Sequence, residues 1–331
     1  MNHPAVSGSP SEKTIQAPQK KRYWRDLDGL LLLDKPTGMT SNAALQRVRR
    51  LFGARKAGHT GSLDPLASGM LPVCFGQGTK VCAYLLESDK TYEVRARFGA
   101  QTDTADADGT VIAESEVKAV AQNDLEQAIR QFVGDIRQVP PMYSALKKDG
   151  RRLYELARQG LTVDRPSRPV TIRSIELIEY DPVEPLLRVS CSKGTYIRTL
   201  VEDIAQAAGT LGHVAVLRRT SVEPFAGLPM ATMEVLEAAG EADEEALERF
   251  LLPVDAALKE FGAVNLSSEQ TRFVRQGNPV QMAGSRATGM YRIYGDEGDF
   301  IGLGEVLADS RLAPKRLFAA PPQPAGEEPQ K

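Results

Sequence analysis

The stretch Gly58-His-Thr-Gly-Ser-Leu-Asp-Pro-Leu-Ala-Ser68 holds a single carboxylate, Asp64, in a loop without another acid and without Lys or Arg. Glycines at positions 58, 61 and 69 permit unusual backbone angles and close approach of the chain, and Pro65 stiffens it just after Asp64. A surface turn normally carries several solvated charges, so this composition indicates that one aspartate is being positioned as a nucleophile or base. The alternative is that Asp64 only caps a turn or a helix that Leu66 could begin.

Other sequence blocks surround this loop in a fixed order. They are Leu32-Leu-Asp-Lys-Pro-Thr-Gly-Met-Thr-Ser-Asn42, Gly69-Met-Leu-Pro-Val-Cys-Phe-Gly-Gln-Gly-Thr-Lys80, Lys90-Thr-Tyr-Glu-Val94, Thr102-Asp-Thr-Ala-Asp-Ala-Asp-Gly109, Pro140-Pro-Met-Tyr-Ser-Ala-Leu-Lys147 and Cys191-Ser-Lys-Gly-Thr-Tyr-Ile-Arg-Thr-Leu200. Together with the Asp64 loop, these blocks resemble the bacterial tRNA pseudouridine synthase B family. The resemblance covers about residues 28 to 318, and so many blocks in one order make the motif set highly specific.

The whole chain has the composition of a globular protein. Its 331 residues are 42% hydrophobic and 25% charged, enough for roughly two domains with a full core. The longest apolar run near the start, residues 30–33, is too short for a signal peptide or a membrane helix, so we expect a cytoplasmic protein. Three cysteines without CxxC spacing and three histidines argue against a disulfide framework, a zinc site or any other metal site.

Charge is segregated along the chain although the net charge is only −2. Residues 137–173 carry nine Lys or Arg against three acids, with Tyr143 and Tyr154 interleaved, whereas residues 234–248 carry seven acids and no base. The basic segment is typical of a phosphate-contacting arm, and the alternative for such a run is a solvated surface.

The hydrophobic pattern mixes strands and helices without regular βαβ alternation, which predicts an α+β core. Strands are expected at residues 29–33, 92–98, 170–180 and 186–192, and helices at 125–132, at 199–207, near 234–252 and after Ser41, which we expect to be a helix cap. Short strand-like pieces at residues 280–282, 290–294 and 300–306, split by Gly-rich turns, predict a small β-barrel.

Two common ligand sites are not supported by their motifs. Gly76-Gln-Gly-Thr-Lys80 has neither the spacing of a phosphate-binding loop nor the third glycine of a dinucleotide fingerprint. The acidic cluster at residues 103–108 does not match a calcium loop, because aligning Gly109 to the invariant glycine puts Thr104 and Ser115 at positions that need acidic ligands. We therefore expect no cofactor and no metal.

The resemblance implies a fold and a division of the chain. The implied fold is the pseudouridine synthase fold, an α+β structure with a mixed, largely antiparallel central sheet, flanking helices and a small C-terminal β-barrel of the PUA type. The corresponding ranges are a catalytic domain at 28–252 with a basic thumb-like insertion at 137–170 and an RNA-binding domain at 253–318. The tails at 1–27 and 319–331 are expected to be disordered because they are rich in polar residues and proline and poor in aliphatic residues.

The resemblance also implies a reaction, in which the N1–C1′ bond of a uridine is replaced by a C5–C1′ bond. The base must be flipped out of folded RNA into a closed pocket. A carboxylate suits this chemistry because it can attack the sugar at C1′, attack the base at C6 or remove the C2′ proton, and can leave again. In a nearly dry site it needs an adjacent guanidinium to remain ionised, because burial raises a carboxyl pKa.

Positions in this chain match residues of the family. Asp64 matches the catalytic aspartate, Arg198 its arginine partner, and Tyr92 the tyrosine that stacks on the flipped base and serves in late deprotonation at C5. The implied substrate-binding residues are His59, Tyr196, Lys35, Lys80, Leu217, Asp106, Lys147 and Arg151. Taken without the family, Arg198 reads as a surface residue and Tyr92 and Tyr196 as core aromatics.

The function that follows is a tRNA pseudouridine-55 synthase acting on the T-arm stem-loop. We expect it to work as a monomer in the cytoplasm, with tRNA as its partner, no membrane attachment and no obligate protein partner. One alternative is a tRNA-binding folding chaperone without catalysis. Another is a guide-RNA-dependent pseudouridine synthase, against which the basic insertion speaks because it would hold a substrate unaided.

Overall fold

The computed structural model describes residues 24–116, 119–284 and 286–319. Its main body is built on a ten-stranded mixed sheet with eight strands in the order β13-β1-β3-β12-β4-β11-β10-β7, while β14 pairs with β1 and β2 with β3. The strands, in sheet order, are β13 Ala231–Thr232, β1 Gly29–Lys35, β3 Ser68–Phe75, β12 Gly212–Val222, β4 Lys90–Phe98, β11 Leu186–Cys191, β10 Arg168–Glu179 and β7 Gly134–Gln138, with β14 Leu251–Leu252 and β2 Ala57–His59.

Most neighbours in this sheet are antiparallel, and the two parallel pairs are β1 with β13 and β3 with β12. The second of these is short, joining Arg218 to Ser68 and Arg219 to Gly69. It brings the end of the Asp64 loop, which runs from β2 to β3, against β12 in the middle of the sheet. The predicted mixed, largely antiparallel α+β architecture is confirmed.

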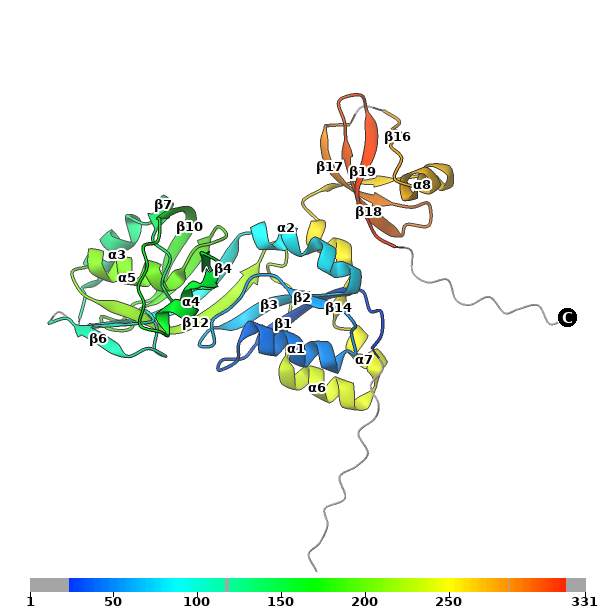
Figure 1. The fold of residues 1–331 in the computed structure, drawn as a ribbon. Coiled ribbons are helices and arrows are strands. Elements are labelled where there is room, and N and C mark those ends of the chain that lie inside the picture. Colours follow the sequence, from blue (N-terminus) through cyan, green and yellow to red (C-terminus); the bar gives the residue numbers. More distant parts are fainter. Residues whose placement is uncertain (1–23, 117–118, 285, 320–331) are drawn as a thin grey trace, which may run out of the picture.

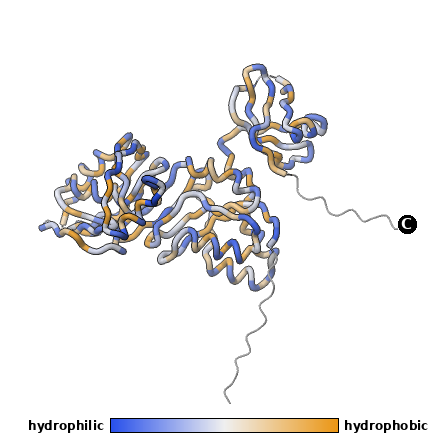
Figure 2. Tube along the Cα trace, in the orientation of Figure 1, coloured by the Kyte–Doolittle hydropathy of each residue, from blue (hydrophilic) through white to orange (hydrophobic). Residues whose placement is uncertain are grey.

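Helices cover the sheet and its edges (Figure 1). They are α1 Ser41–Leu51, α2 Cys82–Glu87, α3 Gln122–Arg130, α4 Leu153–Ala157, α5 Ile197–Ala207, α6 Met233–Ala242, α7 Glu244–Glu248 and α8 Ser268–Arg275, with the 3₁₀ turns η1 Gly76–Val81 and η2 Val254–Leu258. The buried positions Ala44, Leu45 and Val48 lie on one face of α1, as the sequence spacing predicts. Hydrophilic and hydrophobic residues accordingly alternate along the helices that cover the sheet in Figure 2.

Three hydrophobic clusters hold the body together. One lies between α3, α5 and strands β4 and β11, and a second lies between α1, α6 and strands β1 and β3. The third joins the body to the C-terminal part, because Leu303 and Phe318 pack with Leu30, Val81 and Phe225. Burial of these aliphatic and aromatic side chains, at about 25 cal/mol per Å² of apolar surface, is the main term that stabilises the arrangement.

The C-terminal part is a separate five-stranded sheet in the order β15-β17-β18-β19-β16 (Figure 1, orange and red). Its strands are β15 Gly262–Asn265, β16 Val280–Gln281, β17 Gly289–Tyr294, β18 Phe300–Val306 and β19 Arg311–Leu317. The sequence predicted a small barrel here, and the structure shows a curled half-barrel whose outer strands β15 and β16 are not paired with each other. Its own core is formed around Val264, Val274 and Ile293.

Small hairpins complete the fold on the side of α4. Strands β5 Ala100–Thr102 and β6 Val111–Glu114 enclose the acidic turn at 103–109, and β8 Lys147–Lys148 pairs with β9 Arg151–Arg152. The second hairpin and α4 lie within the basic segment at 137–170, which we call the thumb. All four basic residues of this hairpin are exposed.

Helices differ from the sequence prediction at four places: α3 and α5 begin at Gln122 and Ile197 instead of near 125 and 199, and the helix after Ser41 and the acidic helix are capped differently. Thr40, not Ser41, caps α1, because its side chain accepts a hydrogen bond from the backbone N–H of Ala43. Ser41 is the first residue inside the helix and its hydroxyl is used elsewhere. The acidic helix expected near 234–252 is two helices, α6 and α7, because Asp243 is extended (φ −165°) and caps α7 through Glu245 N–H.

The expected disordered tails at 1–27 and 319–331 fall largely outside the described residues. Residues 24–27 are described, and for them the expectation is wrong: Leu27 is buried, and Arg25 donates from its backbone to Gly53 O and pairs with Glu248. Ala319 likewise donates its backbone N–H to the side chain of Gln77. These contacts fasten both ends of the described chain to the body.

Candidate active site

The loop that carries Asp64 is held on both flanks by hydrogen bonds from distant elements. Ser41 Oγ accepts from Leu63 N (2.7 Å) and donates to Leu63 O (3.0 Å), and Gly38 N donates to Pro65 O (2.8 Å). At the C-terminal end, Gly69 has φ +101°, and a Cβ there would lie 2.2 Å from Arg219 O, so only glycine fits this approach of β3 to β12. The loop is therefore a rigid support for one side chain.

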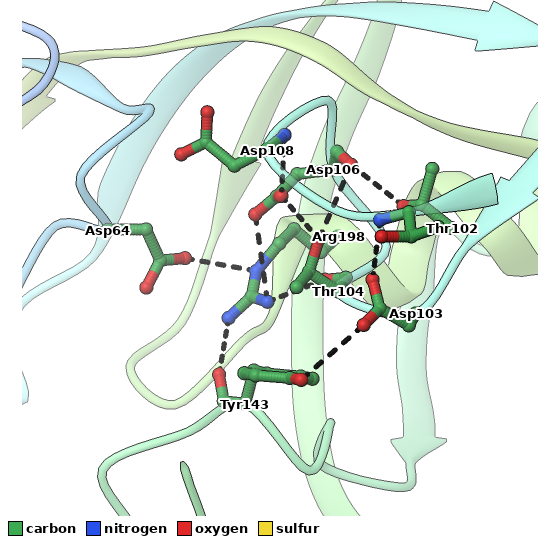
Figure 3. Close-up of polar contacts among 9 residues, drawn as sticks. Asp64, Thr102, Asp103, Thr104, Asp106, Asp108, Tyr143 and Arg198 are labelled. Atoms are coloured by element: carbon green, nitrogen blue, oxygen red, sulfur yellow. Dashed lines mark hydrogen bonds and ion pairs between the residues drawn. The ribbon is translucent and has the colours of Figure 1, made fainter. Parts of the chain in front are cut away.

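Arg198 connects Asp64 to two further segments of the chain (Figure 3). Its Nε lies 3.0 Å from Asp64 Oδ2, while Nη1 donates to Thr104 O (2.6 Å) and Nη2 donates to Tyr143 O (2.7 Å). The residue stands in the first turn of α5, after the extended Tyr196. The guanidinium thus meets the carboxylate through one nitrogen and uses the other two to hold the acidic turn and the thumb.

Asp106 is the second carboxylate near Arg198, at 3.8 Å from Nη1. It is buried, and its Oδ1 accepts hydrogen bonds from Thr104 Oγ1 (2.6 Å) and from Asp108 N (3.2 Å). The backbone at Ala105 adopts a positive φ of 62°, which is uncommon for a residue with a Cβ. The turn therefore adopts a strained backbone conformation, and this conformation places a carboxylate and a carbonyl beside Arg198.

Arg198 and Asp64 differ in exposure, with 5% of the Arg198 side chain and 43% of the Asp64 side chain accessible. Asp64 is open to the pocket and only partly buried. This burial raises the pKa of the Asp64 carboxyl, the Arg198 guanidinium opposes the rise, and Asp106 adds to it. Asp64 is thus a partly exposed carboxylate in contact with one buried cation.

A pocket of about 320 Å³ opens over this pair. Tyr92, Tyr196 and Leu217 supply its aromatic and apolar walls, and Asp64 and Arg198 lie in its lining. Burial raises the pKa of Tyr92, and Arg219 opposes that rise. Burial also raises the pKa of Tyr196. The pocket can therefore enclose a planar ring against aromatic walls while presenting it to a carboxylate.

The structure places the other predicted residues outside this lining. Asp106 lies behind Arg198, as described above. Lys35 is fully buried and donates from Nζ to Pro36 O (2.8 Å) and Met39 O (2.7 Å), and burial lowers its pKa to about 8. These contacts favour a structural role in the turn that follows β1.

His59 and Lys80 lie further along β2 and η1. His59 is half-buried, and burial, followed by the charge of Arg219, lowers its pKa. Lys80 Nζ donates to Leu317 O (2.8 Å) and lies 4.9 Å from the centre of the Phe318 ring. These contacts favour a structural role for Lys80, which joins the body to the C-terminal half-barrel. Lys147 and Arg151 stand on the exposed β8–β9 hairpin of the thumb.

Sequence reasoning missed three residues that support the site. Ser41 holds Leu63, next to Asp64. Gln138 is buried, accepts from Tyr196 N (3.0 Å) and so fixes the start of α5 just before Arg198. Arg219 is fully buried in the pocket lining and donates to Gly61 O and Met70 O. For Arg219, the sequence offered one signal, which is the pair of arginines directly after the predicted pocket residue Leu217.

The described chain comprises residues 24–116, 119–284 and 286–319. No cluster of three or more His, Cys, Asp or Glu in these ranges is arranged to hold a metal ion. Their three cysteines, Cys74, Cys82 and Cys191, are free thiols. Nor does any helix of the described chain have the length and apolarity needed to cross a membrane.

Comparisons with known proteins agree from residue 49 to residue 259 and from residue 262 to residue 318. Three family models match: "TruB family pseudouridylate synthase (N terminal domain)" at 49–197, "tRNA pseudouridylate synthase B C-terminal domain" at 198–259 and "Pseudouridine synthase II TruB, C-terminal" at 262–318. The tRNA pseudouridine synthase B of Pseudomonas aeruginosa (strain UCBPP-PA14) is 52% identical over 301 residues, which are 91% of this chain and 99% of that relative. The protein of the same name from Ectopseudomonas mendocina (strain ymp) is 51% identical over 91% of this chain and 98% of its own length.

Solved structures show the same fold at lower identity. A chain of the crystal structure of a Cbf5-Nop10-Gar1 complex matches with a TM-score of 0.67 and 25% identity, covering 88% of this chain and 85% of that chain. A chain of an H/ACA RNP bound to a substrate RNA containing 2′-deoxyuridine also matches with a TM-score of 0.67, at 23% identity and the same coverage.

Proposed function

The chain belongs to the TruB family of pseudouridylate synthases, and from this premise we propose that it isomerises uridine 55 in the T-loop of tRNA. The relatives' names indicate an isomerase that acts on tRNA uridine. The observation that carries the proposal is the Asp64–Arg198 contact of 3.0 Å inside a pocket walled by Tyr92 and Leu217. The position of the uridine within tRNA is our inference from the family resemblance.

We assign the first chemical step to Asp64. The flipped uridine enters the pocket and lies against Tyr92 and Leu217, which exclude water from the ring. Asp64 then attacks C1′, attacks C6 or removes the C2′ proton, and each of these requires the ionised carboxylate. Arg198 keeps it ionised and aligned from behind. After the ring has turned, C5 bonds to C1′ and Tyr92 serves in the removal of the C5 proton.

RNA contacts outside the pocket are assigned by charge and position. The exposed Lys147 and Arg151 of the thumb would bind phosphates of the T-arm, and His59 would help to hold the flipped loop. We divide the chain into a catalytic domain at 28–252 and an RNA-binding domain at 253–318, and we propose that it acts as a monomer in the cytoplasm without a cofactor. The ordered residues 24–27 extend the first of these domains at its N-terminal end.

The two alternative functions have less support. A chaperone without catalysis would not need Asp64 and Arg198 in contact within a pocket. Guide-RNA dependence is the second alternative, but the relative at 52% identity is named a tRNA pseudouridine synthase B, whereas the likeness to a chain of the Cbf5-Nop10-Gar1 complex is at 25% identity. The higher identity over nearly the full length favours an enzyme that binds tRNA by itself.

A single incubation tests the proposed function. The purified protein, with no added guide RNA, protein or nucleotide, is mixed with a T-arm hairpin, and carbodiimide labelling with mass spectrometry locates pseudouridine. We expect conversion at position 55 and none in an anticodon-arm hairpin of equal length. Full conversion in both hairpins would contradict the T-loop assignment, and no conversion of hairpin or whole tRNA would contradict catalysis.

The thumb offers a test of RNA binding that is separate from chemistry. Charge reversal at both Lys147 and Arg151 should weaken T-arm binding and make the dependence of log K on log salt shallower, by up to about 0.9 for each lost phosphate contact. Single-turnover rates at saturating enzyme should change much less, because the β8–β9 hairpin that carries these two residues lies outside the pocket lining. Fluorescence anisotropy at several salt concentrations measures the slope.

A matched double reversal serves as the control for the loss of positive charge. Arg130 in α3 and Lys259 after η2 are exposed and lie outside the thumb. Reversing both should leave the salt slope near that of the unaltered protein. If the thumb and control variants bind alike, the thumb residues form only a solvated surface.

A further inference from the structure

Arg219 is a buried cation at the pocket with no acidic partner. Only 1% of the residue is exposed, and its Nε donates to Met70 O (2.7 Å) while Nη2 donates to Gly61 O (3.1 Å). Within the described chain, Arg218 pairs with Asp34 and Arg198 with Asp64, but Arg219 has no carboxylate at ion-pair distance. Burying a guanidinium is costly, and two carbonyls satisfy only part of its five N–H donors. This cost suggests a task at the site.

Tyr92 lies directly opposite Arg219 in the sheet. The two residues are register partners across the antiparallel pair β4–β12, so their side chains project from the same face. Both are buried and both line the pocket that holds Asp64. Against the larger rise that burial causes, the Arg219 guanidinium lowers the pKa of the Tyr92 phenol. A fixed positive charge therefore lies against the one tyrosine that the proposed mechanism uses as a base.

We propose that Arg219 is the positioning residue for Tyr92: its guanidinium donates to the phenolic oxygen, stabilises the phenolate and aims it at C5 of the rearranged base. The inference rests on the proposed function. It adds to the Arg198–Asp64 pair a second pair in the pocket, between Arg219 and the Tyr92 phenol. Arg198 serves the carboxylate that begins the reaction, and Arg219 serves the phenolate that ends it.

Arg219 assists the removal of the C5 proton. Once C5 has bonded to C1′, C5 carries both the sugar and its hydrogen, and N1 is joined to C6 by a double bond. The phenolate oxygen of Tyr92 takes the C5 proton, the C5–H electron pair forms the C5–C6 double bond, and the N1–C6 π pair returns to N1, which takes a proton from solvent. The phenol then returns its proton to solvent. The reaction is redox-neutral and needs no co-reactant.

Other charged and titratable groups near Tyr92 do not replace Arg219. Lys90 faces the pocket from the start of β4, but its Nζ donates to Leu86 O and to Ser88 O at the end of α2. Cys191 from β11 and Asp64 from the catalytic loop both disfavour a negative charge on Tyr92. Arg219 is the group that opposes them, which agrees with its role as the phenolate's partner.

Substitution of Arg219 by lysine tests the inference through a kinetic isotope effect. Arg219→Lys keeps a charge but cannot reach Met70 O, Gly61 O and Tyr92 together, so we expect single-turnover pseudouridine formation to fall by about tenfold or more, as for a lost charge-assisted hydrogen bond. The substrate is a T-arm hairpin carrying deuterium at C5 of uridine 55. If Arg219 serves the C5 step, the deuterium effect should be larger in Arg219→Lys than in the unaltered protein.

Arg218→Lys is the matched control, because Arg218 is the adjacent arginine on β12 and its guanidinium is bound to Asp34 instead. It should lower thermal stability without changing the isotope effect. In a Tyr92→Phe background, Arg219→Lys should add little further loss, because the hydroxyl on which it acts is gone. Additive losses with an unchanged isotope effect would overturn the inference and leave Arg219 as a support of the Asp64 loop alone.

A second measurement needs neither variant nor RNA. A high-resolution crystal structure of the unaltered protein should show an Arg219 Nη within hydrogen-bond distance of the Tyr92 oxygen, and a longer separation or another partner on that oxygen would refute the pairing even if Arg219→Lys fails to fold. Failure of the proposed function is seen separately, as no pseudouridine formed by the unaltered protein on either hairpin or whole tRNA.

Discussion

Asp64→Asn should abolish pseudouridine formation while leaving the affinity for a T-arm hairpin within about tenfold of the unaltered protein. The amide has nearly the shape of the carboxylate, and its oxygen can still accept a hydrogen bond from Arg198 Nε, which lies 3.0 Å from Asp64 Oδ2. The loop should also keep its structure. Ser41 and Gly38 bind the loop through its backbone, so these hydrogen bonds do not depend on the Asp64 side chain. What is lost is the nucleophile or base itself, and phosphate contacts elsewhere continue to bind the RNA.

The measurement is single-turnover conversion at saturating enzyme, with binding followed in parallel by anisotropy. Asp124→Asn, at an exposed position in the first turn of α3, controls for the loss of one negative charge and should react like the unaltered protein. A residual rate near that of the control, in a preparation free of host enzyme, would remove Asp64 from the reaction. Loss of binding as large as the loss of rate would point to a collapsed loop.

Arg198→Lys should reduce the single-turnover rate by at least about a hundredfold, and Arg198→Ala by more. The structure gives a reason beyond charge. The guanidinium contacts Asp64 through Nε and simultaneously holds Thr104 O and Tyr143 O through its two Nη groups, so a single ammonium cannot replace it. The variant should therefore lose the alignment of the acidic turn and the thumb against the Asp64 carboxylate.

The pH dependence of this variant follows from the sign of the Asp64 shift. Burial raises the pKa of the Asp64 carboxyl and Arg198 opposes the rise, so a weaker Arg198 contact moves that pKa higher still. More of the variant is then protonated and inactive near neutral pH. Its rate should recover in part as pH rises from about 6 to 9, while the unaltered protein, in which Arg198 lowers the Asp64 pKa, should change less over the same window.

Arg188→Lys controls for a general effect of arginine loss, because Arg188 makes exposed ion pairs with Glu93 and Glu176 away from the pocket lining. Its rate and pH profile should match those of the unaltered protein. A rate for Arg198→Lys equal to this control would show that Arg198 is not the partner of Asp64. A large loss without recovery at high pH would mean that Arg198 acts through alignment alone.

The sequence by itself determined the elements with strong local patterns. The apolar run at β1, the alternation along β4 and the one-sided apolar face of α1 are local properties, because they depend on the repeat of a strand or a helix. Glycines and Pro65 around Asp64 marked a rigid loop before any contact was known. The ordered motif blocks were specific enough to identify the family, which the comparisons confirm.

Only the tertiary structure decided how these residues meet. Arg218 and Arg219 are neighbours with the same side chain, yet one pairs with Asp34 and the other is buried beside Tyr92. The partner of each arginine depends on which face of β12 its side chain occupies and on the register of β12 against β3 and β4. That register involves residues more than a hundred positions away in the sequence. Ser41 was expected to cap a helix and instead holds the Asp64 loop, because the fold brings Leu63 to its hydroxyl. A local pattern can assign a residue to an element and a face, but the partner across that face is set by long-range packing.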